Sequence, residues 1–287
     1  MEQYSHAGFT FDVVDTPPTD PDRSRGTVVL LHGFPQGAYT WDALTPMLNA
    51  RGFRTVCPDQ RGYSPGARPK GRINYRTGLL VDDAAALIEQ LGDGPVHVVG
   101  HDWGAVVAWR LAASRPDLVR TLTAVSVPHS AAYVRSLLTS DQAVRSWYIY
   151  LFQPPFLAEQ LAKRFPAAAD KVLRSTGMDD ELLAATREKF FDRGSLPGSL
   201  NWYRAMMLNA PHDMTRHVAV PTTHVWSTND VALARKGAQI TGEYVDADFD
   251  LRVIEGADHW LPEHRTGELA EIVLDRIDPQ PESASQD

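Results

Sequence analysis

The stretch that most constrains this chain is an apolar strand followed at once by a sharp turn and a helix. Residues 96–99 are apolar and β-branched apart from His97, which suits a central parallel strand, and apolar residues recur at helical spacing after Gly104. Asp102 occupies the turn, with Gly100 and Gly104 two positions away on either side. Glycines there relieve the crowding around a residue of positive φ. The layout is that of a nucleophile elbow carrying aspartate; the alternative is an aspartate that only caps the helix.

Strand-like and helix-like stretches alternate on both sides of this elbow. Before residue 130, the other expected elements are an edge hairpin at 4–15, buried strands at 26–31, 53–57 and 122–127, and helices at about 40–50 and 75–91. Parallel strands are joined by helical crossovers. The alternation therefore predicts an α/β fold with a mostly parallel central sheet and helices on both faces.

The segment 130–216 departs from this alternation, because it is helical in pattern, interrupted by Pro and Gly, and rich in aromatic residues. Alternation resumes afterwards, with strands expected at 222–226 and 251–254, helices at 231–242 and 267–277, and a disordered polar tail from 278. An all-helical insert between two strands is expected to lie over the carboxyl ends of the strands, where open α/β sheets bind ligands. We therefore expect a core domain of residues 1–129 and 217–287 and a helical cap domain of residues 130–216.

Composition narrows the class of protein. A chain of 287 residues accommodates one large α/β domain with an insert. Its net charge of −8 and the lack of a basic cluster argue against a nucleic-acid partner. Cys57 is the only cysteine, so no internal disulfide is expected, and no metal or nucleotide motif is present, so no cofactor is expected. Without a signal peptide or a membrane-spanning apolar run, a soluble cytoplasmic protein is expected.

Two residues at the ends of later strands complete a catalytic set with Asp102. Asp230 follows the strand expected at 222–226, and His259 follows the one at 251–254. Nucleophile, acid and histidine occur in the chain order of α/β-hydrolase triads, with His259 as the base and Asp230 as its orienting acid. Asp258 is an alternative acid, although adjacent side chains on a loop seldom face the same way. The alternative for His259 is a structural loop histidine.

The type of nucleophile limits the reaction. The backbone N–H groups of Trp103 and Phe34 are expected to form an oxyanion hole, unless the turn that contains Phe34 merely ends a strand. Attack of the Asp102 carboxylate on an ester would give an anhydride. Attack on a saturated carbon that bears a leaving group gives an alkyl-enzyme ester, which water can cleave. An epoxide or an alkyl halide is therefore the expected substrate.

Several motifs resemble those of the epoxide hydrolases of the α/β-hydrolase fold, and the resemblance covers nearly the whole chain. The matching segments are His32-Gly33-Phe34-Pro35, Asp59-Gln60-Arg61-Gly62-Tyr63, Gly100-His101-Asp102-Trp103-Gly104, Tyr148-Ile149-Tyr150-Leu151-Phe152-Gln153 and Leu200-Asn201-Trp202-Tyr203-Arg204. The resemblance implies an α/β-hydrolase fold with a helical cap. It also implies that Tyr148 and Tyr203 donate hydrogen bonds to the epoxide oxygen. Tyr150 is an alternative to Tyr148, although the spacing to Phe152 and Gln153 favours Tyr148.

Two departures from the family pattern concern loops near the expected site. Ser227 stands where the family usually has glycine ahead of the acid, and Pro154-Pro155-Phe156 replaces the family's E-P-G. The second departure bears on the shape of the pocket. Aromatic and methionine residues in the cap suggest a small, mostly apolar epoxide as the partner, and the sequence leaves a homo-oligomer open; these cap residues are Trp147, Phe156, Met206 and Met207.

Two other functions compete with epoxide hydrolysis. Haloalkane dehalogenases share the elbow and Trp103, but many have a second halide donor near the position of Phe34, whose side chain has no N–H. Fluoroacetate dehalogenases carry arginines just after the nucleophile, where this chain has Trp103-Gly104-Ala105. A non-catalytic, hydrolase-like ligand-binding protein typically has a serine elbow or lacks a triad member, and neither applies to this chain.

Overall fold

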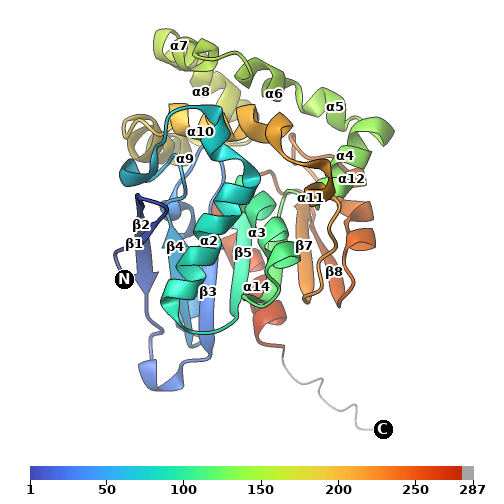
Figure 1. The fold of residues 1–287 in the computed structure, drawn as a ribbon. Coiled ribbons are helices and arrows are strands. Elements are labelled where there is room, and N and C mark those ends of the chain that lie inside the picture. The colour runs from blue at the N-terminus through green and yellow to red at the C-terminus, as the bar shows by residue number, and fades with distance from the viewer. Residues whose placement is uncertain (280–287) are drawn as a thin grey trace.

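The computed structural model describes residues 1–279, which are organised around an eight-stranded sheet (Figure 1). The strands lie in the order β1-β2-β4-β3-β5-β6-β7-β8. Those from β3 to β8 run parallel, and the β1–β2 hairpin adds an antiparallel edge. Their bounds are β1 (Gln3–His6), β2 (Phe9–Thr16), β3 (Gly26–Leu31), β4 (Phe53–Pro58), β5 (Val96–His101), β6 (Val119–Val125), β7 (Thr222–Ser227) and β8 (Phe249–Ile254). The predicted mostly parallel sheet and the edge hairpin are confirmed.

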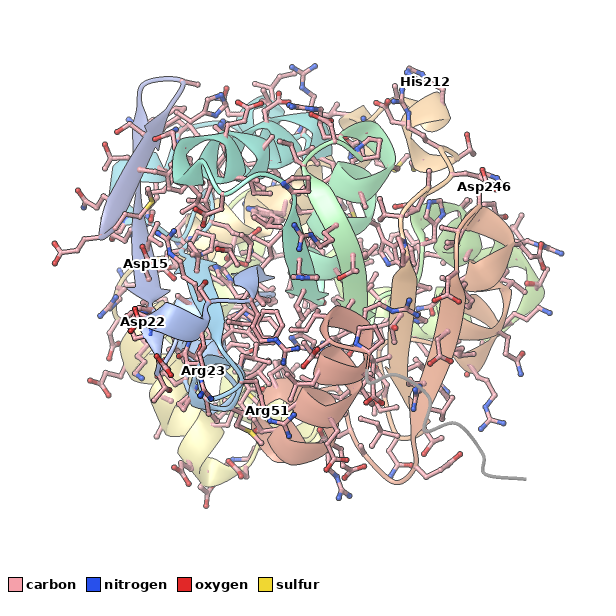
Figure 2. All side chains as sticks on the ribbon, turned by 90° about the horizontal axis from the view of Figure 1, so that it is seen from below. Asp15, Asp22, Arg23, Arg51, His212 and Asp246 are labelled. Atoms are coloured by element: carbon pink, nitrogen blue, oxygen red, sulfur yellow. The ribbon has the colours of Figure 1, made fainter. Side chains whose placement is uncertain are left out.

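Helices cover both faces of the sheet, as Figure 2 shows from below. In β3, Val29 and Leu31 pack on the face covered by α2 and α3, whereas Val28 and Leu30 pack on the face covered by α1 and α14. Alternate side chains of a strand point to opposite faces, so a strand buried on both sides has to be apolar throughout. The helices of the core are α1 (Thr45–Asn49), α2 (Thr77–Leu91), α3 (Trp103–Ser114), α12 (Arg235–Ile240), α13 (Leu261–His264) and α14 (Thr266–Ile277).

Two of the predicted helices are wrong in extent. The helix expected at 40–50 is a 3₁₀ turn, η2 (Ala38–Trp41), followed by the short α1, which begins beside Pro46 because proline fits only the first turn of a helix. The helix expected from 231 starts only at Arg235, because the Asp230 carboxylate accepts hydrogen bonds from the next amides and holds that segment in a turn. The tail expected from 278 falls mainly on residues 280–287, which lie outside the described residues.

The chain between β6 and β7 is helical wherever its backbone is regular, and Figure 1 shows α5, α6 and α7 in a row above the sheet, with α8 beneath α7. Aromatic rings of this segment contact residues that follow β3 and β5, so the predicted cap covers the carboxyl edge of the sheet. No helix in the described residues is both long and apolar enough to span a membrane. The cap elements are α4 (Ser130–Thr139), α5 (Gln142–Arg145), α6 (Trp147–Phe152), α7 (Leu157–Arg164), α8 (Pro166–Ser175), α9 (Asp180–Thr186), η5 (Arg187–Phe191), α10 (Leu196–Ala205), η6 (Met206–Leu208) and α11 (Pro211–Met214).

Gly104→Ala is expected to lower the free energy of unfolding by about 3 kcal/mol, because a Cβ on Gly104 would lie 2.0 Å from the carbonyl oxygen of Leu31. Gly78→Ala in α2 is the matched control. Nothing lies within 4 Å of its added Cβ, so the better helix former should raise stability by roughly 0.5 kcal/mol. Urea unfolding followed by tryptophan fluorescence measures both changes. Equal effects of the two substitutions would contradict the close packing of α3 on β3.

Candidate active site

Asp102 lies in the turn between β5 and α3 with φ 51° and ψ −119°, a backbone conformation that is rare for residues other than glycine. Its neighbours approach closely: a Cβ on Gly33 would lie 2.4 Å from the Cβ of Asp102, and a Cβ on Gly100 would lie 2.4 Å from the carbonyl oxygen of Gly104. Only glycine fits these two positions. Although Asp102 precedes α3, its side chain makes no capping hydrogen bond, which argues against the helix-cap alternative.

The two predicted oxyanion amides surround the Asp102 carboxylate itself. The N–H of Phe34 donates to Asp102 Oδ1 at 2.8 Å. Burial raises the pKa of Asp102, and the N–H groups of Phe34 and Trp103 oppose that rise. The Phe34 turn is held by the buried His32 ring, whose Nε2 accepts from the Gln60 N–H at 3.1 Å and whose Nδ1 lies 3.1 Å from the Gly33 carbonyl oxygen.

His259 lies between two carboxylates that come from different strands. Its Nδ1 is 2.8 Å from Asp230 Oδ2, and its Nε2 is 3.8 Å from Asp102 Oδ2. The other oxygen of Asp230 accepts hydrogen bonds from the N–H groups of Ala232 and Leu233 at 2.8 and 2.9 Å. Burial by itself raises the pKa of Asp230, but His259 and these amides outweigh burial and lower it. Asp230 therefore stays ionised and orients the ring.

The charge of His259 depends on these carboxylates. Burial lowers the pKa of His259, but the negative charges of Asp230, Asp102 and Asp258 outweigh burial and raise it to about 9. His101 packs against the ring at 4.9 Å between centroids, and its Nε2 lies 3.0 Å from the His259 carbonyl oxygen. Burial lowers the pKa of His101 to about 3, so this second imidazole stays neutral and adds no competing charge.

Asp258, the alternative acid, has other partners. Its Oδ1 accepts from the Trp260 N–H at 2.9 Å, and its Oδ2 lies 2.9 Å from Nδ1 of His264. The hydroxyl of Ser227 donates to the Asp258 carbonyl oxygen at 2.7 Å. The serine that replaces the usual glycine therefore ties the loop of Asp230 to the loop of His259.

The structure brings Tyr148 and Tyr203 together over Asp102. Their rings are 6.0 Å apart at 80°, on α6 and α10 respectively. Burial raises the pKa of both phenols well above the usual value, and the Asp102 charge raises it further. Both therefore keep their protons at neutral pH. Tyr150 is 71% exposed and lies away from this pair, because residues two apart on a helix face different directions.

Apolar rings line the site on the side of the cap. Phe34 meets Phe152, Phe190 and Tyr203 with ring centroids 5.3 to 5.7 Å apart. Phe190, in η5, was missed by the sequence analysis because no motif singles it out.

Three of the four cap residues that suggested an apolar substrate lie on the surface of the protein. Trp147, Phe156 and Met207 are 55%, 72% and 85% exposed. Phe156 has φ 67°, a conformation that suits the glycine of the family's E-P-G. Phe156 therefore shapes the surface of the cap, and the apolar wall of the site is formed by the buried rings of Phe34, Phe152 and Phe190.

Other motif residues hold the cap in place. The indole N–H of Trp202 donates to the Arg61 carbonyl oxygen at 2.8 Å, and the Arg61 side chain forms a buried, two-pronged ion pair with Asp83. Within the cap, Arg204 pairs with both carboxylate oxygens of Glu159 at 2.8 Å. These side chains act through their neighbours, because they fix α10, and with it Tyr203, in place over the core.

Comparison with known proteins agrees with this geometry. Residues 26–180 match the sequence profile of the alpha/beta hydrolase fold family, which is the class that the sheet and the elbow define. The AB hydrolase superfamily protein YfhM of Bacillus subtilis is 33% identical over 259 residues, which cover 87% of this chain and 89% of that protein. Epoxide hydrolase A of Mycobacterium tuberculosis is 31% identical over an alignment 289 positions long, and the match covers 86% of this chain and 89% of that protein.

A solved structure is similar over nearly its whole length. The crystal structure of epoxide hydrolase VrEH1 from Vigna radiata has a TM-score of 0.79 and 26% identity, and the match covers 95% of this chain and 96% of that one. The chain therefore belongs to the epoxide hydrolase family of the α/β-hydrolase fold.

Proposed function

We propose that this protein adds water to an epoxide and releases a vicinal diol through a covalent ester on Asp102. The observation that carries the proposal is the arrangement around this strained aspartate, with His259 on one side and two protonated phenols above it. The sheet (1–129 and 217–287) would provide the nucleophile, base and acid. The cap (130–216) would provide the phenols and the apolar wall.

In the first step, Asp102 Oδ2 attacks a ring carbon of the epoxide and breaks its bond to oxygen. Oδ2 is the attacking atom because Oδ1 is held by the Phe34 amide. The oxygen that leaves carries an alkoxide charge, and the phenols of Tyr148 and Tyr203 donate hydrogen bonds and one proton to it. These contacts strengthen as the charge develops, so they act mainly on the transition state.

In the second step, His259 takes a proton from water, and the hydroxide attacks the carbonyl carbon of the ester. The negative charge develops on Oδ1, to which the Phe34 amide already donates, and the Trp103 amide also stabilises negative charge on this carboxyl group. Collapse of this intermediate expels the diol oxygen, which takes the proton of the new carboxyl group and leaves Asp102 ionised. The proton held by His259 then replaces the one that the phenol gave away.

A substrate panel tests the reaction class. Styrene-type, aliphatic and fatty-acid epoxides should yield diols, whereas bromoalkanes should release bromide slowly, because the Phe34 side chain offers a halide no N–H donor. Faster release of bromide than of any diol would favour a haloalkane dehalogenase. Binding of epoxides without turnover would favour a non-catalytic ligand-binding protein.

Asp230→Asn is expected to slow ester hydrolysis on the order of 10³-fold, because the amide no longer fixes the tautomer or offsets the charge of His259. Alkylation should slow by less than about tenfold, since Asp102 is unchanged. Asp258→Asn is the matched control and should leave both steps within about threefold, because Asp258 pairs with His264. Single-turnover fluorescence separates the two steps. The reverse ranking of the two variants would make Asp258 the acid.

The two steps are expected to depend on pH through different groups. Alkylation needs ionised Asp102, so its rate should fall as pH drops through the raised pKa of this carboxyl. Hydrolysis needs neutral His259. Burial and three carboxylates set the pKa of His259 at about 9 in the free protein, and Asp102 is one of the three. Ester formation removes the Asp102 charge, so the pKa of His259 in the intermediate lies below 9 and hydrolysis slows only below that pKa.

Single-turnover hydrolysis rates across pH, set beside an NMR titration of His259 in the free protein, test this shift. The rate should have its inflection at a lower pH than the titration. If the hydrolysis rate and the NMR titration had their inflections at the same pH, the charge of Asp102 would have no effect on the pKa of His259.

A further inference from the structure

The outer side of the cap carries an exposed apolar face that has no role in the steps above. Helices α6 and α7, which belong to the row at the top of Figure 1, both turn large apolar side chains outward, each between 38% and 72% exposed. In α7, residues 157 and 161 are four positions apart and share this side, while Ala158 is buried on the other. The residues, here called the cap face, are Trp147, Tyr150, Phe156, Leu157, Leu161 and Phe165.

The cap face gathers all the exposed aromatic residues of the described chain. Its tryptophan, its tyrosine and its two phenylalanines are exposed, whereas every other aromatic side chain among the described residues is buried or half-buried. Single exposed apolar residues are ordinary on a soluble protein, but a contiguous group of them marks a surface that contacts something else. The distribution therefore points to a contact outside the chain.

Phe156 supports this reading through its backbone. Its φ of 67° crowds the Cβ of any residue but glycine, and α7 begins directly after it. Its ring is 72% exposed, so packing within the chain offsets little of that strain. A bulky ring held in this conformation at the surface is explained if the ring is buried by something that the chain binds.

The charge around the cap face limits what that can be. Residues 142–174 carry five basic and two acidic side chains, although the whole chain has 28 basic and 36 acidic ones. Both acidic residues of this segment pair with arginines from elsewhere in the cap, Glu159 with Arg204 and Asp170 with Arg187. The basic residues of the segment that form no ion pair with any described residue are Lys163, Arg164 and Lys171. A basic, apolar surface on an acidic protein suits a negatively charged partner.

We propose that the cap face binds reversibly to an anionic lipid surface. Aromatic rings beside exposed cations are typical of segments that lie in the membrane interface, where the rings enter the boundary of the acyl chains and the cations meet the headgroups. A second copy of this chain fits less well. Contact across a two-fold axis would bring Lys163 and Arg164 close to the same two cations of the other copy.

Vesicles made of equal parts of phosphatidylglycerol and phosphatidylcholine test the proposal. The protein should sediment with them and bind vesicles of pure phosphatidylcholine at least about tenfold more weakly. Trp147 is 55% exposed, whereas the other six tryptophans are at most 7% exposed. Brominated acyl chains should therefore quench the emission of Trp147, and Trp147→Phe should lose this quenching while it still sediments with the vesicles.

Two substitutions should weaken binding to the anionic vesicles without unfolding the protein. Phe156→Gly should do so by on the order of tenfold or more, because it removes one inserted ring. Its stability to urea should not fall, because glycine relieves the positive φ. Lys163→Glu should weaken binding by on the order of tenfold through charge.

The matched controls lie at the other end of the protein. Arg51→Glu makes the same charge change just before β4 begins, on the side seen from below in Figure 2, and Met47→Gln removes an exposed apolar side chain from α1. Both should bind vesicles like the wild type. No binding by the wild type, or equal losses in variants and controls, would overturn the proposal. So would a dimer that Phe156→Gly dissociates in a protein that ignores the vesicles, because the occupant would then be a second copy. None of these measurements involves turnover, so they are independent of the ester mechanism.

Discussion

His259→Gln is expected to lower steady-state turnover by on the order of 10⁴-fold or more while the protein still forms the ester with its substrate. The nucleophile is untouched, and its Oδ1 keeps the hydrogen bond from the Phe34 amide. Glutamine cannot take a proton from water, so the second step stops. The alkyl-enzyme should therefore accumulate in place of diol.

Intact-mass analysis after mixing with an epoxide should show a gain of one substrate mass, and peptide mapping should place it on Asp102. His217→Gln is the control. His217 is exposed and pairs with Asp246, which Figure 2 shows at the edge of the molecule, so this variant should turn over normally. Absence of an adduct in His259→Gln, with binding of the epoxide demonstrated, would exclude Asp102 as the nucleophile.

The second large effect concerns the cap phenols. Tyr148→Phe or Tyr203→Phe should each slow alkylation by on the order of 10- to 1,000-fold, the range expected for loss of one donor to a developing oxyanion. Each single substitution leaves the other phenol in place. The double variant has neither donor, so it should be nearly inactive on epoxides. The core should stay folded, because both rings keep their packing against Phe152 when only the hydroxyl is removed.

Single-turnover quenching of tryptophan fluorescence measures alkylation in the wild type, the two single variants and the double variant. Tyr150→Phe is the matched control, because this exposed phenol in α6 lies outside the pair and its loss should leave the rate unchanged. Full epoxide turnover by the double variant would show that the ring oxygen obtains its proton from another source.

The sharp turn at Asp102 could be predicted from local chemistry, and its proximity to Asp230 and His259 could be predicted from the order of the strands. Gly100 and Gly104 are needed wherever a helix turns back this tightly on its strand, and their contacts show that no side chain fits. Asp230 and His259 follow strands whose carboxyl ends share one edge of the sheet, so their meeting follows from the topology.

The choice between neighbours needed the structure. Asp258 and Asp230 are both plausible acids in the sequence, and only the path of the loop shows that Asp258 pairs with His264. Tyr148 and Tyr150 likewise share a helix, and which of them faces Tyr203 depends on how α6 packs against α10. Long-range packing sets both outcomes, although the chain order already favoured Asp230 and the spacing to Phe152 and Gln153 already favoured Tyr148.

Features without a motif could not be predicted. Phe190 lies in the π-helical turn η5, and only the folded protein shows that its ring packs against that of Phe34. Gln36 and Glu263 are 227 residues apart in the chain, and the link between them exists only in the folded protein. The prediction of one helix at 40–50 was wrong for a simpler reason. Pro46 fits only the first turn of a helix, so α1 begins at Thr45 and does not continue from η2.

A first turnover in water enriched in ¹⁸O tests the ester on Asp102 most directly. Water attacks the carbonyl carbon of the ester, so the heavy oxygen should enter the carboxylate of Asp102, and the diol should leave with an ordinary oxygen taken from the protein. Enzyme in excess over a styrene-type epoxide, followed by mass analysis of the diol and of the peptide that contains Asp102, gives both readings. Label in the peptide and not in the diol is the expected result. Label in the diol after that single turnover would mean that water attacks the epoxide directly, and the covalent mechanism would be wrong.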